Sequence, residues 1–144
     1  VDVETTGADT SRLLSDIDLV VVAESFAETY TGIASTGQAL RALARDTGAA
    51  LVVATLGERG SLAVCQDVEI ATPAFPVDCV DSTGAGDVFR AGLAAGLLQQ
   101  PNGSVEEILR YANAVAALNC RAVGACGGLP SATEVARLLA GDRA

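Results

Sequence analysis

The stretch Asp81–Asp87, which reads DSTGAGD, decides the fold of this chain. A strand-like run over 75–80 leads into it, and a helix-like run over 88–98 leads out of it. Glycines at such a loop-to-helix step let backbone N–H groups point at one spot, and a helix N-terminus with bare amides is an anion site. Asp87 stands at the edge of that site. The combination suits phosphoryl transfer to an alcohol, because the amides stabilise the transferred group and the carboxylate accepts the hydroxyl proton.

The same residues also have a structural interpretation. Gly84 and Gly86 are equally what a tight turn requires. Asp87 is equally a first-turn acid favoured by the helix dipole, which stabilises such a residue by about 0.3–1 kcal/mol. Small residues follow in the helix, and they favour close packing of that helix against a sheet. They are Ala91, Gly92, Ala94, Ala95 and Gly96.

Composition narrows the possible classes of function. The 144 residues are enough for one domain with a core, and aromatic content of only 3% means that Ala, Val and Leu must build it. The apolar runs are too short to span a bilayer, and no signal peptide is recognisable, so we expect a cytoplasmic protein. The net charge of −9, without a basic cluster, argues against nucleic acid or an anionic membrane as partner.

Missing residue types exclude several chemistries within this chain. Without Lys there is no Gly-x-x-x-x-Gly-Lys phosphate loop, and without His there is no Ser-His-Asp triad. Phe89 stands where a dinucleotide fingerprint would place its third glycine. No cysteine pair has Cys-x-x-Cys spacing, so we expect reduced, mostly buried thiols, with a Cys120–Cys126 disulfide as the alternative. The cysteines are Cys65, Cys79, Cys120 and Cys126.

Strand-like and helix-like segments alternate from residue 1 to 55, which predicts an α/β fold with a parallel sheet and helices on both faces. Residues 61–64 and 68–71 read as a hairpin or as successive short strands. Two Ser-x-x-Glu capping boxes open helices at Ser104 and Ser131. Without a linker or repeat, we expect one α/β nucleotide-binding region over 1–144. The expected strands lie at 1–3, 19–23 and 50–55, and the further helices at 11–14, 24–30 and 36–47.

The run DSTGAGDVFRAGLA at 81–94 resembles the C-terminal signature of the ribokinase-like, or PfkB, sugar kinases. That signature reads Asp-Thr-x-Gly/Ala-Ala/Gly-Gly-Asp, then three residues and two small ones, here Ala91 and Gly92. The resemblance covers essentially the whole chain as the C-terminal half of a longer kinase domain. It implies the ribokinase-like fold, with ATP across this half and the acceptor mainly against the other half.

The resemblance also implies roles for the signature residues. Asp87 would be the catalytic base, and the amides of Gly84, Ala85 and Gly86 would form the anion hole for the γ-phosphate. The turn TLGERG at 55–60 is similar to the family's Thr-Leu-Gly-x-x-Gly turn, which touches nucleotide phosphate and ribose. This adds nucleotide-binding roles for Thr55, Gly57 and Gly60, although a plain hairpin turn explains the same pattern.

Two further sites follow from the resemblance. Asn113 falls where the family places a residue beside adenine, and a solvent-facing helical Asn is the alternative. The family often binds a monovalent cation such as K⁺ through backbone oxygens near the anion hole. The matching positions here are Asp81, Thr83, Asn119, Ala122 and Gly124.

The chain departs from the family at three positions. An Asn-x-x-Glu motif that organises Mg²⁺ through water aligns with Ala23 and Phe26, neither of which can hold a hydrated metal. Glu24 or Glu28 is a possible substitute. Arg90 stands where Asn or His is often found. These differences concern how Mg²⁺ is held and the subgroup, and they leave Asp87 and its loop intact.

The sequence therefore predicts an ATP- and Mg²⁺-dependent kinase that phosphorylates a hydroxyl of a sugar or sugar-like small molecule. Within the kinases, nucleosides are the alternative acceptors, and a homodimer through parts outside this chain is possible by resemblance. Two other classes stay open. One is a nucleotide- or anion-binding relative without catalysis, or an inactive fragment, and the other is an α/β structural domain whose loop only resembles the signature.

Overall fold

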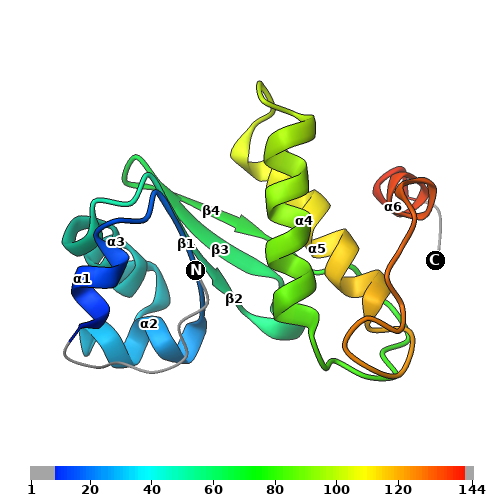
Figure 1. Ribbon diagram of the computed structural model, residues 1–144, viewed down its shortest axis with the longest axis horizontal. Coiled ribbons are helices and arrows are strands. Elements are labelled where there is room, and N and C mark those ends of the chain that lie inside the picture. Colours follow the sequence, from blue (N-terminus) through cyan, green and yellow to red (C-terminus); the bar gives the residue numbers. More distant parts are fainter. Residues whose placement is uncertain (1–8, 142–144) are drawn as a thin grey trace. The chain divides into compact units, whose positions relative to one another are not determined.

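A computed structural model describes residues 9–141 of the chain (Figure 1). They form two compact units. The first comprises the residues up to Gly57 together with Ser61–Ala71, and the second comprises Glu58–Gly60 and the residues from Thr72 onward. The strand expected at residues 1–3 lies outside the described residues.

The first unit contains a four-stranded mixed sheet in the order β1-β2-β3-β4. Its strands are β1 (Leu19–Ala23), β2 (Leu51–Thr55), β3 (Ser61–Cys65) and β4 (Val68–Thr72, whose last residue belongs to the second unit). β1 and β2 pair in parallel, with Val20 opposite Val52, whereas β2 and β3 pair antiparallel. The predicted α/β class is confirmed, but the sheet is mixed rather than wholly parallel.

A tight hairpin joins β3 to β4. Only Gln66 and Asp67 separate β3 from β4, and both have positive φ values, of 50° and 62°. Two consecutive residues with positive φ form the hairpin turn whose twist matches that of the strands, and so short a connection cannot link parallel strands. Of the two interpretations of 61–71, the hairpin is the one observed. Arg41 and Arg45 of α3 also bind the Asp67 side chain of this turn.

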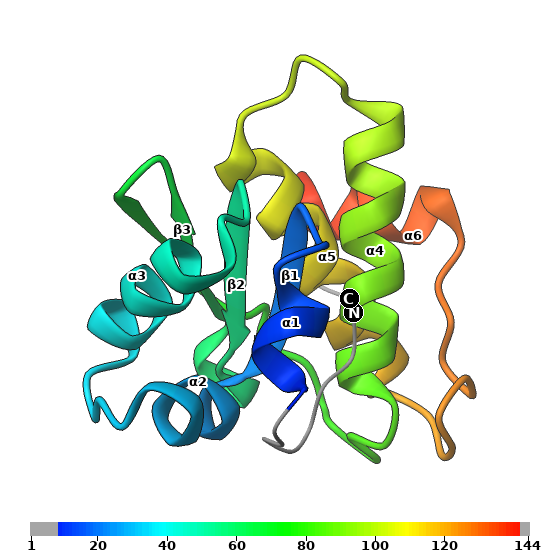
Figure 2. The same cartoon turned by 60° about the vertical axis from the view of Figure 1, so that its left-hand side comes forward.

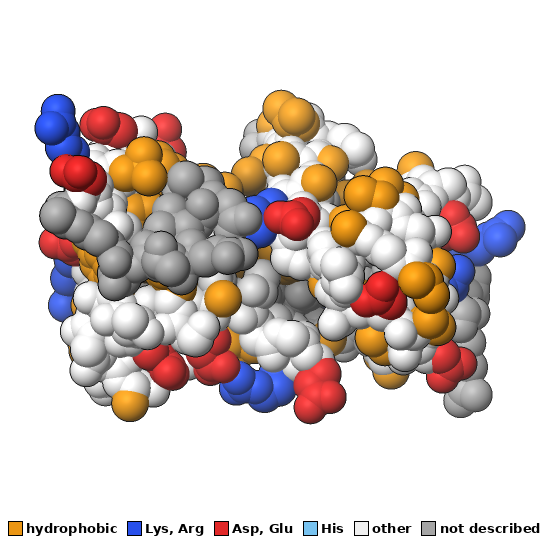
Figure 3. Space-filling view, turned by 60° about the horizontal axis from the view of Figure 1, so that its bottom comes forward, with side chains coloured by type: hydrophobic (Ala, Val, Ile, Leu, Met, Phe, Trp, Pro, Cys, Tyr) orange, Lys and Arg blue, Asp and Glu red, His pale blue; other side chains and the backbone are white. Residues whose placement is uncertain are grey.

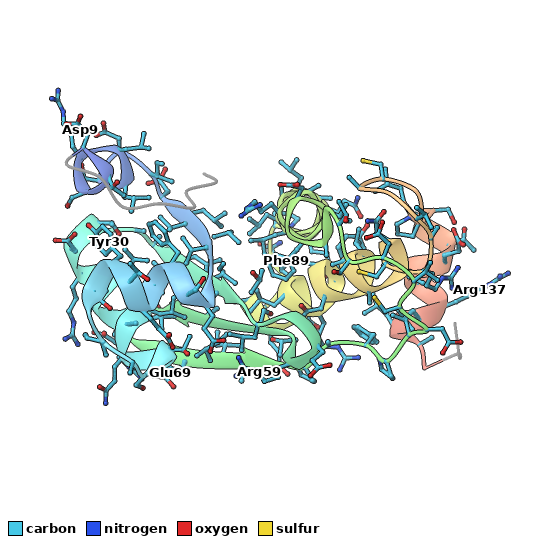
Figure 4. All side chains as sticks on the ribbon, turned by 90° about the horizontal axis from the view of Figure 1, so that it is seen from below. Asp9, Tyr30, Arg59, Glu69, Phe89 and Arg137 are labelled. Carbon is cyan, nitrogen blue, oxygen red and sulfur yellow. The ribbon has the colours of Figure 1, made fainter. Side chains whose placement is uncertain are left out.

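Three helices of the first unit are α1 (Thr10–Leu14), α2 (Glu24–Thr31) and α3 (Thr36–Thr47). Alternate strand residues meet these helices in one core, because successive side chains of a strand point to opposite faces. Tyr30, labelled in Figure 4, stacks on Phe26 at 5.8 Å between ring centroids and donates a hydrogen bond to Asp46. The buried core comprises Leu14, Val20, Val22, Phe26, Ala27, Ala39, Leu40, Leu43, Val52, Ala54 and Val64.

The second unit is built on two helices that lie side by side in both Figure 1 and Figure 2, α4 (Ala85–Gln99) and α5 (Val105–Asn119). Their contact depends on two glycines one turn apart on α4. A Cβ on Gly92 would lie 3.1 Å from Ala112 Cα, and one on Gly96 would lie 3.1 Å from Ile108 Cγ2. These two glycines therefore pack against α5 rather than against a strand, whereas Ala91 and Ala94 of the predicted small-residue stripe are exposed.

The segment before the signature is not the predicted strand. Pro76 has no N–H to give to a sheet, and the N–H groups of Val80 and Asp81 both donate to the carbonyl of Cys120, at 2.8 and 3.1 Å. The segment thus docks on the C-terminal end of α5 in irregular conformation. Phe75 adds to the core between α5 and α6 (Ala132–Leu139), and Arg110 lies 5.7 Å from its ring centroid.

Both predicted capping boxes form. Ser104 Oγ accepts the Glu107 N–H while the Glu107 carboxylate accepts the Ser104 N–H, and Ser131 and Glu134 repeat the arrangement. These boxes start α5 and α6 where the sequence placed them. Within the described range, no helix combines the length and the apolar character needed to cross a membrane.

Candidate active site

The N-terminus of α4 is arranged differently from those of α5 and α6. Its N-cap is Gly84, and no side chain caps it. The N–H of Ala85 donates to the Ser82 carbonyl at 3.1 Å, so this amide of the predicted anion hole is already satisfied. The next two amides, of Gly86 and Asp87, are first-turn N–H groups with no carbonyl four residues earlier inside the helix. The amides of Gly86 and Asp87 are therefore available to an anion, whereas that of Ala85 is engaged. The predicted anion hole of Gly84, Ala85 and Gly86 stays a prediction.

Gly84 has a conformational role at this terminus. Its φ of +74° is left-handed, a region that other residues enter only with strain. A Cβ there would also lie 2.6 Å from the Ala125 carbonyl oxygen and 2.8 Å from Ala125 Cα. Gly84 thus brings the start of α4 into contact with Ala125 in the loop after α5, which fixes the position of the first-turn amides.

Asp87 presents its carboxylate beside these amides. Its side chain is 73% exposed, and Oδ1 accepts a hydrogen bond of 3.0 Å from Nη1 of Arg90, whose side chain is only 25% exposed. The carboxylate is therefore open to an incoming hydroxyl group on one side and held by a guanidinium on the other. Sequence reasoning noted Arg90 only as a departure from the family. The i,i+3 spacing from Asp87 was the signal that places both residues on one helix face.

Asp81 organises the loop that precedes Gly84. Oδ2 accepts the N–H of Gly124 at 2.8 Å, and Oδ1 accepts the N–H of Thr83 at 2.9 Å. These hydrogen bonds hold the pKa of the Asp81 carboxyl below its ordinary value, and the bond from the Gly124 N–H has the larger effect of the two. Asp81 thus links the signature loop to the loop after α5.

The Asp81 bonds predict a pH-dependent contribution to stability. Because the pKa of Asp81 is lower in the folded chain, its stabilisation is complete above the unfolded-state pKa and is lost as the pH falls through the folded-state value. We expect Asp81→Asn to lower the free energy of unfolding at pH 7. The difference from wild type should shrink as the pH is lowered below 4. Urea unfolding at a series of pH values measures this, and a pH-independent difference would contradict the assignment.

The five predicted cation-binding positions all lie in the second unit, and hydrogen bonds bring Asp81, Thr83 and Gly124 together. The Asn119 and Gly124 carbonyls each accept a backbone N–H, from Ala122 at 3.5 Å and from Gly127 at 3.1 Å. Asn119 is fully buried, and its Oδ1 has no hydrogen-bond partner among the described residues. A buried oxygen without a hydrogen-bond donor, close to backbone carbonyls, has the donor chemistry that a cation requires.

The predicted nucleotide-binding turn is divided between the units. Thr55 ends β2 and Gly57 opens the short 3-10 helix η1 (Gly57–Arg59), both in the first unit, whereas Gly60 belongs to the second. Thr55 Oγ1 donates to the Val22 carbonyl at 3.4 Å. Gly60, with φ of +96°, lies so close to the Thr72 carbonyl oxygen that a Cβ would be 2.1 Å from it. The turn thus forms as predicted, and its nucleotide contacts stay a prediction.

Asn113 is a buried residue of α5 rather than the solvent-facing Asn of the alternative interpretation. Its Nδ2 donates to the carbonyls of Thr72 and Pro73, at 3.2 and 3.5 Å. It therefore fastens the end of β4 and the residue that follows it onto α5. A role beside adenine stays a prediction. The side chain that would take this role already donates hydrogen bonds within the fold.

The position for the family's magnesium motif does not suit a metal ion. Phe26 is 3% exposed in the core of the first unit, and Ala23 has no ligating atom in its side chain. Glu24, one possible substitute, accepts a hydrogen bond of 2.7 Å from Thr36 Oγ1. Among residues 9–141, no three His, Cys, Asp or Glu side chains cluster in a way that could hold a metal.

The cysteines differ in part from expectation. All four are free, and no Cys120–Cys126 disulfide forms. Cys120 is buried, which together with the neighbouring Cys79 thiol raises the pKa of its own thiol. Cys79 and Cys126 are exposed, so the prediction of mostly buried thiols was wrong. Both lie in irregular segments whose placement no local pattern indicates.

On the face shown in Figure 3, the basic side chains are few and scattered, and acidic ones lie among them. This agrees with the net charge of −9 and with nine Arg as the basic residues of the chain. A surface of this kind does not provide the continuous positive field that backbone phosphates of nucleic acids require. The expectation that no nucleic acid binds stays a prediction.

Comparison with known proteins decides the family. The profile described as pfkB family carbohydrate kinase matches residues 3–132. The chain belongs to the pfkB family. The signature at 81–94, on which the resemblance rested, falls inside this match, and the family assignment made from the sequence is confirmed.

Individual pfkB proteins are similar to this chain over most of its length. Fructokinase-1 of Oryza sativa subsp. japonica is 36% identical over 128 residues, covering 85% of this chain and 39% of that protein. The structure of Arabidopsis thaliana ribokinase complexed with ribose and ATP matches with a TM-score of 0.82 at 32% identity, covering 96% of this chain and 46% of that one.

A double mutant of fructokinase from Vibrio cholerae O395, in a form bound to fructose, ADP and potassium ion, matches with a TM-score of 0.82 at 28% identity. It covers 92% of this chain and 44% of that one. These matches confirm the ribokinase-like α/β fold. The chain spans less than half the length of the curated pfkB relatives that it matches.

Proposed function

We propose that this chain is the nucleotide-binding part of an ATP-dependent phosphotransferase that moves the γ-phosphoryl group to a hydroxyl of a sugar or sugar-like small molecule. One observation carries the proposal. An exposed carboxylate, Asp87, stands beside uncapped first-turn amides of α4. Membership of the pfkB family and the ribose- and fructose-bound relatives support this chemistry.

Each group has a defined task in the proposed reaction. The amides of Gly86 and Asp87 donate hydrogen bonds to the oxygens of the transferred group, where the helix dipole also favours negative charge. The Asp87 carboxylate orients the acceptor hydroxyl and takes its proton. Because phosphoryl transfer proceeds through a loose transition state, that proton can leave late, and an ordinary carboxylate is sufficient.

Two ions belong to the proposal. Mg²⁺ would accompany ATP, since this ion is usually held by one or two carboxylates together with substrate phosphates. A monovalent cation such as K⁺ would bind the backbone oxygens near the signature loop, next to the unpartnered Asn119 Oδ1. There it would stiffen the two loops that Asp81 already links. The presence of potassium ion in the fructokinase complex supports this part of the proposal.

The acceptor panel is the experiment that tests the reaction class. ATP consumption by the full-length protein should be followed with Mg²⁺ and K⁺ across hexoses, pentoses, their phosphates and nucleosides. We expect turnover that depends on one class of acceptor. Nucleoside-only turnover would place the protein among nucleoside kinases, and silence across the panel would contradict the proposal.

A catalytically inactive nucleotide-binding relative is the second candidate. Burial of Phe26 in the core, at a position where the family organises Mg²⁺, favours it. Nucleotide binding measured by calorimetry, combined with silence across the acceptor panel, would select this candidate. Absence of nucleotide binding would leave only an α/β structural domain.

The anion site can be tested at Gly86. Its Cβ position is open, with Arg90 Nη1 at 3.6 Å as the nearest neighbour, and Cβ atoms tilt toward a helix N-terminus. A methyl group there would project toward the amides without a clash in the fold. We expect Gly86→Ala to melt at or above the wild-type temperature and to bind ATP more weakly, by about tenfold if one hydrogen bond to a charged group is lost. Unchanged ATP affinity by calorimetry would contradict the assignment.

A further inference from the structure

The guanidinium of Arg90 lies over the first turn of α4, where the bare amides are. Long helical side chains point back toward the helix N-terminus, and Arg90 follows this rule from a position about one turn downstream. Its Nη1 is 3.0 Å from Asp87 Oδ1 and 3.6 Å from the position that a Cβ on Gly86 would occupy. A fixed positive charge, two amides and the acceptor-facing carboxylate therefore meet at one place.

The Arg90–Asp87 ion pair by itself contributes little to folding, because Asp87 is well exposed and a carboxylate at the start of a helix is already favoured by the dipole. The arrangement does answer an electrostatic problem of the reaction. A phosphoryl group that binds the Gly86 and Asp87 amides brings negative oxygens next to the Asp87 carboxylate, and the two repel each other. A guanidinium beside both relieves the repulsion.

We propose that Arg90 is a ligand of the transferred phosphoryl group, a role that rests on the proposed kinase function. Its planar fork keeps one nitrogen on Asp87 while another donor reaches a phosphoryl oxygen. Arg90 thereby holds the carboxylate in place and stabilises the charge of the transition state. The γ-phosphoryl group, which ATP has and ADP lacks, is therefore the part of the nucleotide that Arg90 recognises.

The test compares two nucleotides in the full-length protein. Arg90→Met retains the apolar stem and removes the charge. We expect it to bind the non-hydrolysable β,γ-imido analogue of ATP about tenfold more weakly, with ADP affinity unchanged, as loss of one charged hydrogen bond predicts. We expect its kcat to fall about 10²- to 10³-fold with an unchanged KM for the acceptor, as for loss of one transition-state donor. Arg90→Lys, which keeps the charge, should recover part of the loss.

Arg137→Met is the matched control. Arg137 lies on α6, its side chain is exposed, and Figure 4 shows it pointing away from the helix. The control should leave both affinities and kcat unchanged. Thermal melting checks the fold of each variant. If Arg90→Met fails to fold, Arg90→Lys replaces it in the test, and we expect its ratio of analogue affinity to ADP affinity to be lower than that of the wild type.

The outcomes separate this inference from the function on which it rests. Suppose that the wild type binds both nucleotides and turns over, and that Arg90→Met folds with an unchanged kcat and an unchanged ratio of analogue affinity to ADP affinity. This result would overturn the role of Arg90 alone. Equal losses of ADP and analogue affinity would also overturn it, because they indicate a structural role. A wild-type protein that binds neither nucleotide would overturn both the inference and the proposed function.

Discussion

Replacing Asp87 by Asn is expected to lower kcat by about 10²- to 10⁴-fold, the usual contribution of a positioned acid or base. The amide has almost the same shape as the carboxylate and accepts the hydrogen bond from Arg90 through its oxygen, but it cannot take the acceptor's proton. The side chain is 73% exposed, so the exchange leaves no buried polar group without a partner. We therefore expect the melting temperature and ATP affinity to stay close to wild type.

Glu106→Gln is the matched control for this variant. Glu106 is also an acid in the first turn of a helix, α5, and it is exposed and outside the capping box. Its replacement removes the same favourable interaction with a helix dipole. Steady-state turnover of both variants shows whether Asp87 acts as a base or only interacts with the helix dipole. If Asp87→Asn turned over as fast as Glu106→Gln, the catalytic role would be wrong.

Replacing Gly84 by Ala is expected to give the largest loss of stability. The left-handed conformation alone costs an L-residue about 1–2 kcal/mol. The added methyl group would also lie 2.6 Å from the backbone oxygen of Ala125, and backbone cannot move aside as a flexible side chain does. Overpacking of this kind costs about 1–3 kcal/mol more. Because the clash pushes the start of α4 from its loop, kcat should fall as well, by about 10²-fold for a displacement near 1 Å.

Gly32→Ala is the control that separates the steric clash at residue 84 from the strain of a left-handed backbone. Gly32 has a similar φ of +69° after α2, but a Cβ there would meet nothing within 4 Å. Its replacement should therefore cost only the conformational part and should leave kcat unchanged. Urea unfolding measures both losses. Equal losses for the two variants would mean that the contact between Gly84 and Ala125 does not hold the helix in place.

Local signals in the sequence predicted the elements well. Both Ser-x-x-Glu boxes start helices as expected, and α2 and α3 end at Gly32 and Gly48. These features depend on neighbours within four residues, so a sequence pattern contains all the information. The uncapped start of α4 at Gly84 was predictable in the same way, because a glycine loop and a helix start specify it locally, whereas its binding of an anion stays a prediction.

Contacts between distant segments were not predictable in the same way. Residues 75–80 have a strand-like pattern, but the Cys120 carbonyl accepts the backbone N–H groups at their end, and a pattern read along the chain cannot show this. The sequence also did not indicate that Gly92 and Gly96 face α5, or that Ala125 lies against Gly84. The satisfied Ala85 amide depends on how the loop turns at Ser82. Each of these features depends on which parts of the chain come into contact in the folded structure.

Phosphorus NMR of the full-length protein tests the central claim most directly. ATP, Mg²⁺ and K⁺ are mixed with the responsive acceptor class, and the γ-phosphorus signal is followed in wild type and in Asp87→Asn. We expect the wild type to convert that signal into a phosphate ester of the acceptor, with ADP formed in equal amount, and the variant to form almost none. Bound ATP that yields no ester in wild type, or ester formation at equal rates in both proteins, would contradict the account.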